Sequence, residues 1–128
     1  MIIMMTKNQT IFETQVLEVG AETPDFKSIG MAILFGNEAP DALRPSCFII
    51  NVKPLQDTIE PGMSLIIDNQ TYQITAVGNE VQTNLGRLGH TAVCFTGETT
   101  AKLPGSLYVE QADYPDIKVG SQIKIVKA

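Results

Sequence analysis

The sequence predicts an all-β fold, a small closed or partly open β-barrel with one short helix. Short runs of β-branched and aromatic residues recur along the chain, and turn residues separate them. Only one segment has the spacing of a helix. Many short strands at regular spacing are typical of barrels and sandwiches. Because the chain has 128 residues, we expect one domain over 1–128.

Eight segments have the composition of strands. Gly, Pro, Asn and Asp punctuate the gaps between them, as at Pro61-Gly62 and Pro104-Gly105. The clearest hairpin turns at Asp68-Asn69, two residue types that tolerate a left-handed backbone. The predicted strands are 11–19, 31–35, 47–52, 64–67, 71–77, 91–95, 106–110 and 122–126.

The helical segment lies within residues 78–89. Val81, Leu85 and Leu88 follow one another at i, i+4 and i+7, which places them on one helical face as packing residues. Asn79 is a candidate N-cap and Gly89 a candidate stop. We expect a two-turn helix over one end of the barrel, and one short helical turn in the polar loop 36–45.

Residues 59–67 and 117–125 share the pattern I-x-x-G-x-x-Φ-x-Φ, where Φ is apolar. In each, the glycine turns the chain into a strand whose alternate residues face inward. Two explanations fit this repeated pattern: either the barrel has two duplicated halves, or a common turn arose twice independently.

The charge and the apolar pattern exclude several classes of protein. A net charge of −5 would repel a phosphate backbone, so we expect no nucleic-acid partner. No window is long and apolar enough for a membrane span, and the Met1–Met5 stretch is too short for a signal peptide. Cys47 and Cys94 sit in apolar runs, which predicts buried free thiols. The expected location is the cytoplasm, without direct membrane insertion.

The single histidine limits the chemistry that the chain can perform. A structural zinc site needs about four nitrogen or sulfur ligands, which one His and two separated Cys do not supply. Nucleophile-elbow, phosphate-loop and dinucleotide motifs are missing from the sequence. We therefore expect no metal and no cofactor. The carboxylates of Glu38, Asp41, Asp113 and Asp116 lie in polar loops and are expected to be solvated.

His90 lies between the predicted helix stop and a predicted strand. A neutral imidazole at such a rim is a candidate phospho-acceptor. Arg87, Thr91 and the backbone N–H groups of Gly86 and Gly89 are candidate donors to the phosphoryl oxygens. The alternative is a structural histidine that bonds a nearby carbonyl.

Five short motifs between Ala32 and Ile125 resemble a known family. They are A-P-D-A-L at 39–43, C-F-I at 47–49, Y-Q-I-T-A-V-G at 72–78, N-L-G-R-L-G-H at 84–90 and P-G-S-L-Y-V at 104–109. In this order they resemble the glucitol/sorbitol-specific enzyme IIA component of the bacterial phosphoenolpyruvate-dependent sugar phosphotransferase system. The two strongest motifs are Y-x-I-T-A-V-G and N-L-x-x-L-G-H, and their joint occurrence at this spacing is fairly specific.

The resemblance implies a cytoplasmic β-barrel phosphocarrier for sugar uptake. Such a protein accepts a phosphoryl group on histidine from the histidine phosphocarrier protein. It passes the group to the IIB part of the IIB/IIC sugar permease and needs no cofactor. Exposed strand edges would also allow a homodimer.

One position departs from the family pattern. The resemblance implies that the phosphorylated histidine directly follows C-F-I, and Ile50 occupies that place here. The Gly-His pair does carry over, onto Gly89-His90. Either His90 carries the phosphoryl group, or the chain is a non-catalytic binding or regulatory module that has lost transfer. Cys47 is a weaker candidate acceptor, because an apolar strand raises the pKa of a thiol.

Overall fold

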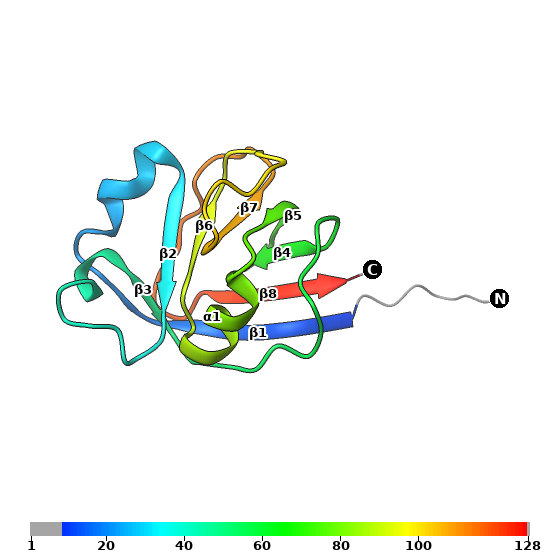
Figure 1. Cartoon of the computed structure of the whole chain (residues 1–128). Helices are drawn as coiled ribbons and strands as arrows, with labels where there is room; N and C mark the ends of the chain where they lie inside the picture. The colour runs from blue at the N-terminus through cyan, green and yellow to red at the C-terminus, as the bar shows by residue number, and fades with distance from the viewer. Residues whose placement is uncertain (1–8, 128) are drawn as a thin grey trace.

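Eight strands close into one barrel in the computed structural model, which describes residues 9–127 (Figure 1). The order around the ring is β1-β3-β2-β6-β7-β5-β4-β8, and β8 pairs with β1. This confirms the predicted fold class, while the Met1–Met5 stretch lies outside the described residues. The strands are β1 Gln9–Val19, β2 Met31–Phe35, β3 Phe48–Ile50, β4 Ser64–Ile67, β5 Gln70–Val77, β6 Thr91–Cys94, β7 Ser106–Val109 and β8 Gln122–Lys127.

The barrel interior is filled by the inward-facing residues of these strands. Ile11, Ile50, Leu65, Ile74 and Leu107 are each at most 1% exposed and belong to one apolar cluster. Burying an aliphatic side chain of this size contributes about 1.5–3 kcal/mol. The cluster therefore holds strands from both ends of the sequence together.

The predicted helix forms as α1 (Val81–Leu88). Val81 and Leu85 are buried as expected, and Gly89 ends the helix with φ 69°. Two details were wrong. The N-cap is Glu80 rather than Asn79, without a side-chain capping bond, and Leu88 is 44% exposed rather than packed.

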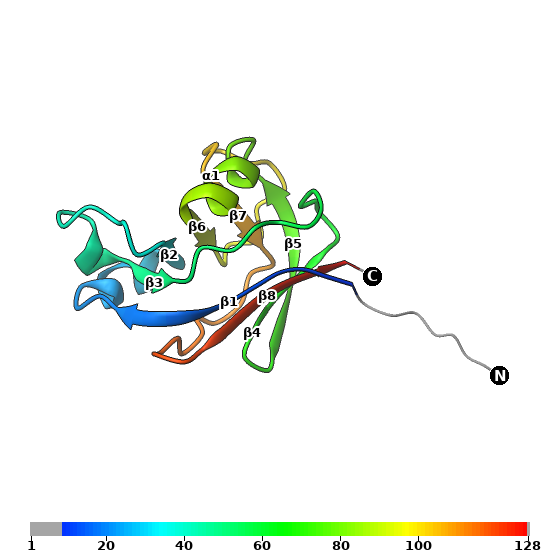
Figure 2. The ribbon, with the colours of Figure 1, turned by 90° about the horizontal axis from the view of Figure 1, so that it is seen from below.

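Two short 3₁₀ helices complete the structure. η2 (Arg44–Ser46) supplies the helical turn expected in the loop before β3. η1 (Thr23–Ile29) was not predicted from the sequence. In Figure 2, β1, β8 and β4 run side by side along one side of the barrel, and α1 lies on the other side near β6.

The predicted hairpin joins β4 and β5. Ile67 pairs with Gln70, and Asp68 adopts a left-handed φ of 54° in the turn between them. Tyr72, Ile74 and Ala76 are buried along β5, as their alternation predicted. Both cysteines are free and buried. In the described range, no helix is long and apolar enough to cross a membrane.

The eight strands repeat as two sets of four. Strands β1, β2, β3 and β4 correspond in order to β5, β6, β7 and β8, because each pairing has a counterpart. β1 with β3 and β5 with β7 are antiparallel, whereas β2 with β3 and β6 with β7 are parallel. β1 with β8 corresponds to β5 with β4. The β2–β6 and β4–β8 pairs join the two repeats about an approximate two-fold axis.

The correspondence extends to single hydrogen bonds. Gly20 N–H donates to Cys47 O at 2.9 Å, and Gly78 N–H donates to Ser106 O at 2.9 Å. The register shift after Val16 recurs after Ile74. Matching detail of this kind across all strands favours duplication of a whole half-barrel over independent use of one turn. The further matching bonds are Glu22 N–H to Pro45 O and Glu80 N–H to Pro104 O, both at 2.8 Å.

Candidate functional site

His90 is held on a tight turn at the end of α1. The N–H of Gly89 donates to Leu85 O at 3.0 Å, and the N–H of His90 donates to Asn84 O at 3.2 Å. These bonds satisfy the last carbonyls of the helix, and the left-handed Gly89 makes the reversal possible. β6 begins immediately after His90, so the backbone of His90 is fixed between the end of α1 and the start of β6.

The imidazole of His90 is half-buried and stacks on Phe35. The two ring centroids are 4.1 Å apart, and the ring planes differ by 14°. Burial lowers the pKa of His90 below its ordinary 6.5, because the charged form loses hydration. The ring is therefore neutral at pH 7, and residues 9–127 offer neither ring nitrogen a hydrogen-bond partner. A neutral, unpaired ring nitrogen can act as a nucleophile.

Ile50, the position that the resemblance implies for the acceptor, lies directly behind this turn. A Cβ placed on Gly89 would lie 3.4 Å from Ile50 Cγ1 and 3.0 Å from Gly36 N. Ile50 itself is 0% exposed and belongs to the barrel core. The fold therefore places Gly89, the residue directly before His90, against the implied acceptor position, although the two are far apart in sequence.

Two exposed apolar side chains flank the turn. Val52 is 45% exposed and Leu88 is 44% exposed. The Val52 side chain and the Leu88 backbone lie against Gly36, where a Cβ would be 2.4 Å from Val52 Cγ2 and 2.5 Å from Leu88 O. The N–H of Gly36 donates to Leu88 O at 2.8 Å. The site thus has a small apolar rim, which we call the Val52–Leu88 rim.

The groups expected to assist phosphate binding differ in their availability. Thr91 is 1% exposed and its hydroxyl donates to Gly105 O at 3.1 Å, so it has a structural role. The N–H of Gly89 is committed to Leu85 O. Both are corrections to the expected donor set, and both arise because each donor has a partner within the fold. Arg87 is exposed in the last turn of α1 and has no ion-pair partner in the described residues.

The other candidate groups do not join the site. Burial raises the pKa of the Cys47 thiol, and its Sγ donates to Leu43 O at 3.2 Å. A thiol in this state is a poor nucleophile. The carboxylates of Glu38, Asp41, Asp113 and Asp116 are on exposed residues, as their loop positions predicted.

Sequence reasoning missed Phe35 and Gly36. Both lie at the end of β2, which pairs with β6 so that Leu34 is opposite Thr91. That register puts Phe35 beside His90. A Phe-Gly pair at the end of an apolar strand was the available signal, but it identifies a histidine partner only once the β2–β6 pairing is known.

Comparison with known proteins identifies a family. The profile described as "PTS system glucitol/sorbitol-specific IIA component" matches residues 11–124. Two curated relatives are each named "PTS system glucitol/sorbitol-specific EIIA component", one from Shigella flexneri and one from Escherichia coli (strain K12). Each is 34% identical over 114 residues, which cover 89% of this chain and 93% of the relative.

A solved structure has the same fold. It is described as the crystal structure of a PTS system IIA component from Enterococcus faecalis V583. The TM-score is 0.79 at 30% sequence identity, and the superposition covers 88% of this chain and 97% of the other. The likeness therefore spans most of this chain and nearly all of the other.

Proposed function

The chain belongs to the glucitol/sorbitol-specific IIA component family of the sugar phosphotransferase system, and we propose that it relays a phosphoryl group on His90. One observation carries this proposal. The single imidazole of the chain is half-buried with a lowered pKa, and it directly follows Gly89, which lies against Ile50, the position that the family resemblance implies for the acceptor. We place the reaction in the cytoplasm and assign it to one domain of 128 residues.

The proposed transfer is a displacement at phosphorus. A neutral ring nitrogen of His90 attacks the phosphorus of a donor phosphohistidine, and the nitrogen–phosphorus bond of the donor breaks as the new one forms. The donor ring leaves as a neutral imidazole because its other nitrogen carries a proton or takes one from water, and the other nitrogen of His90 releases its proton to water, so protons and phosphoryl charge both balance. Arg87, three residues before His90, is the available cation for the oxygens. Positioning accounts for most of the catalysis in such transfers, and this step requires no metal or cofactor.

The proposed partners follow from the family. The histidine phosphocarrier protein supplies the phosphoryl group, and the IIB part of the IIB/IIC permease receives it during sugar uptake. Transient complexes of this kind bury small surfaces with an apolar centre. The Val52–Leu88 rim beside the turn is suited to such contact. A homodimer through strand edges is not proposed, because the eight described strands pair in a closed ring.

A phosphorylation assay tests the proposal. The protein is incubated with phosphoenolpyruvate, enzyme I and the histidine phosphocarrier protein, and its intact mass is measured. We expect one acid-labile phosphoryl adduct on the wild type and none on His90→Gln, which keeps a planar polar side chain of similar size. Arg87→Gln should keep the adduct but form it more slowly. An adduct that persists in His90→Gln would overturn the assignment of His90.

A second candidate function is a non-catalytic binding or regulatory module. Two observations favour it: Ile50 is apolar and fully buried at the implied acceptor position, and the N–H groups of Gly89 and His90 are committed to the helix end. This function predicts no adduct on the wild type. It also predicts that the protein still binds the phosphocarrier or the permease component in a titration followed by amide chemical shifts.

A further inference from the structure

Two equivalent positions of the barrel differ, because a side chain fills one of them and leaves the other hollow. At the filled position, Gln82 of α1, in the second repeat, reaches the segment before β4, which belongs to the first repeat. Its Oε1 accepts a hydrogen bond from Ile59 N–H at 2.9 Å, and its Nε2 donates to Asp57 O at 3.0 Å. Leu85, one turn later, is 1% exposed in the core. The Gln82 carboxamide and the Leu85 side chain together fill the barrel at this position.

The corresponding residues of η1, in the first repeat, cannot close the barrel at the equivalent position. Thr23 N–H donates to Gly20 O as Val81 N–H donates to Gly78 O, which fixes the correspondence between η1 and α1. Pro24 therefore stands where the second repeat has Gln82, and the exposed Lys27 stands in the place of Leu85. Proline has no side-chain amide, and a lysine ammonium is not buried without a partner.

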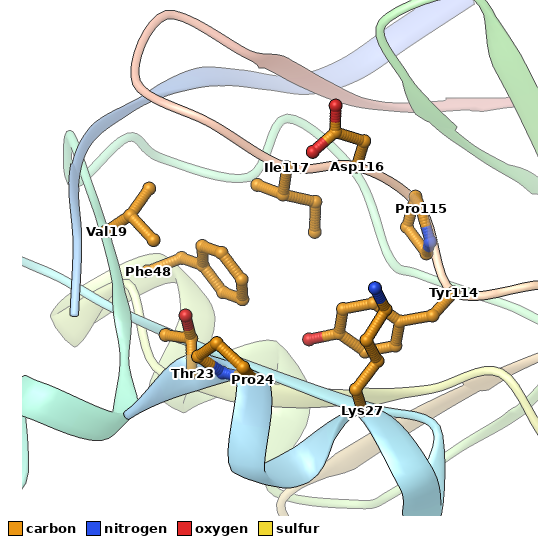
Figure 3. Close-up of a pocket in the computed structure, with 9 residues that line it drawn as sticks. All are labelled: Val19, Thr23, Pro24, Lys27, Phe48, Tyr114, Pro115, Asp116 and Ile117. Atoms are coloured by element: carbon orange, nitrogen blue, oxygen red, sulfur yellow. The ribbon is translucent and has the colours of Figure 1, made fainter. Parts of the chain in front are cut away.

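A cavity of about 290 Å³ lies at this place, open to solvent between η1 and the segment before β8 (Figure 3). Phe48, Val19 and Tyr114 form apolar walls. Figure 3 shows the Lys27 side chain extending toward Tyr114, with Phe48 and Ile117 on another wall. Lys27 forms no ion pair with any residue in 9–127. The cavity thus combines an apolar surface with one free cation.

The cavity also has an unpaired backbone donor and acceptor. Ile117 and Pro115 line it, and they correspond to Ile59 and Asp57 of the first repeat. In 9–127, neither Ile117 N–H nor Pro115 C=O has a hydrogen-bond partner. At the filled position, the carboxamide of Gln82 pairs with the two equivalent groups, Ile59 N–H and Asp57 C=O. The segment before β8 therefore has a backbone donor and acceptor like those that bind this carboxamide, and η1 has no side chain that supplies one.

We propose that this cavity binds a small molecule that carries a primary carboxamide and an anionic group a few carbons away. The carboxamide oxygen accepts from Ile117 N–H, its nitrogen donates to Pro115 C=O, and the anion meets Lys27. The hydroxyls of Thr23 and Tyr114 are already donated to Gly20 O and Met31 O, so they do not define the ligand. The Asp116 carboxylate is 91% exposed and faces Lys118 at 4.0 Å. This site is separate from His90, and the inference does not depend on the proposed phosphoryl transfer.

Three probes test the chemistry of the ligand. Glutaramate has both groups, glutarate lacks the amide, and butyramide lacks the anion. Binding is followed by the shift of the Ile117 backbone amide in a ¹H–¹⁵N spectrum of the full chain. We expect glutaramate to bind about tenfold more tightly than either control, a difference of about 1.4 kcal/mol. Equal binding of glutaramate and glutarate, or no shift at Ile117, would overturn the proposal.

Variants of the chain test the geometry. Pro24→Gln should fill the cavity with the carboxamide of the second repeat and abolish glutaramate binding. Pro24→Ala, which also removes the proline but adds no amide, should keep it. Lys27→Met should weaken glutaramate about tenfold and leave butyramide unchanged, whereas Lys53→Met on another exposed surface should change neither. Binding to Pro24→Gln at wild-type strength would overturn the proposal, provided that its spectrum shows a folded protein.

Discussion

The imidazole of His90 lies flat against the ring of Phe35, with centroids 4.1 Å apart. Phe35 is 8% exposed, so one face of the imidazole is shielded from water. Because this contact joins β2 to the start of β6, the site depends on a pairing between the two repeats of the barrel. The chemistry proposed for His90 therefore depends on barrel closure.

Protonation of His90 should lower the stability of the protein in mild acid. Its pKa is lowered in the folded state by burial, so the unfolded chain binds more protons between the folded value and 6.5. The contribution of His90 to the free energy of unfolding should be constant above about pH 7, and the free energy should fall as the pH drops through this range. Urea denaturation at a series of pH values measures it.

The control for this prediction is His90→Gln. It should remove the part of the pH dependence that lies just below 6.5 and leave carboxylate titrations at lower pH unchanged. Phe35→Leu should raise the pKa of His90 toward 6.5, as measured by the ring proton shifts, because water reaches the imidazole. A pKa at or above 6.5 in the wild type would contradict this account.

Gly89→Ala should destabilise the fold by roughly 1–3 kcal/mol. Gly89 has φ 69°, and an added Cβ would lie 3.0 Å from Gly36 N. Gly62 also has a positive φ, of 97°, but a Cβ there would meet nothing within 4 Å. Gly105 has no positive φ, and a Cβ there would also meet nothing within 4 Å. Comparing urea midpoints of the three variants separates backbone strain from steric contact. Equal midpoints for Gly89→Ala and Gly105→Ala would contradict the geometry of the turn.

Ile50→His should restore an acceptor at the position implied by the family. An imidazole in this fully buried place should cost about 1–3 kcal/mol of stability, because it loses apolar packing and hydration. In the phosphoenolpyruvate-dependent assay we expect a phosphoryl adduct that persists in the double variant with His90→Gln. Ile50→Gln is the matched control with similar polarity and no acceptor, and it should remain unmodified. An unmodified but folded Ile50→His would argue that the fold no longer docks its donor.

The two thiols should react slowly in the native protein. Cys47 and Cys94 are 1% and 5% exposed, and burial raises the pKa of both. At pH 7 their alkylation by iodoacetamide should be far slower than after unfolding in urea, where both are exposed. Intact mass against time measures the rate. Fast single labelling of the folded protein would contradict the burial of one thiol.

Much of the barrel was predictable because each strand carries its own signal. The strand at 31–35 and the hairpin at Asp68-Asn69 need only local apolar runs and turn residues to be recognised. The 3₁₀ helix η1 has no such signal, since its residues lack helical periodicity and include Pro24. It is positioned by contacts with η2 and β2, which are tertiary.

The site was only partly predictable for the same physical reason. His90 could be found because it is the one histidine of the chain. The role of Thr91 could not be foreseen, because its hydroxyl bonds Gly105 across the β6–β7 pair. Phe35 and Ile50 come from other strands, so the contacts of Phe35 with His90 and of Ile50 with Gly89 can be predicted only once the order of strands around the barrel is known. The duplication was visible only in residues 59–67 and 117–125, because elsewhere the two halves have diverged in sequence.

The exchange of strands between the two repeats has a consequence for how the protein holds together. Both neighbours of β4, β5 and β8, belong to the second repeat, and both neighbours of β8, β1 and β4, belong to the first. A half-length chain would therefore leave one strand without a neighbour, and it could complete the ring only by interlocking with a second copy of itself. The present chain is equivalent to such an intertwined pair joined end to end. Because the two members are joined in one chain, they need not be identical, and one has Gln82 where the other has a cavity lined by Lys27.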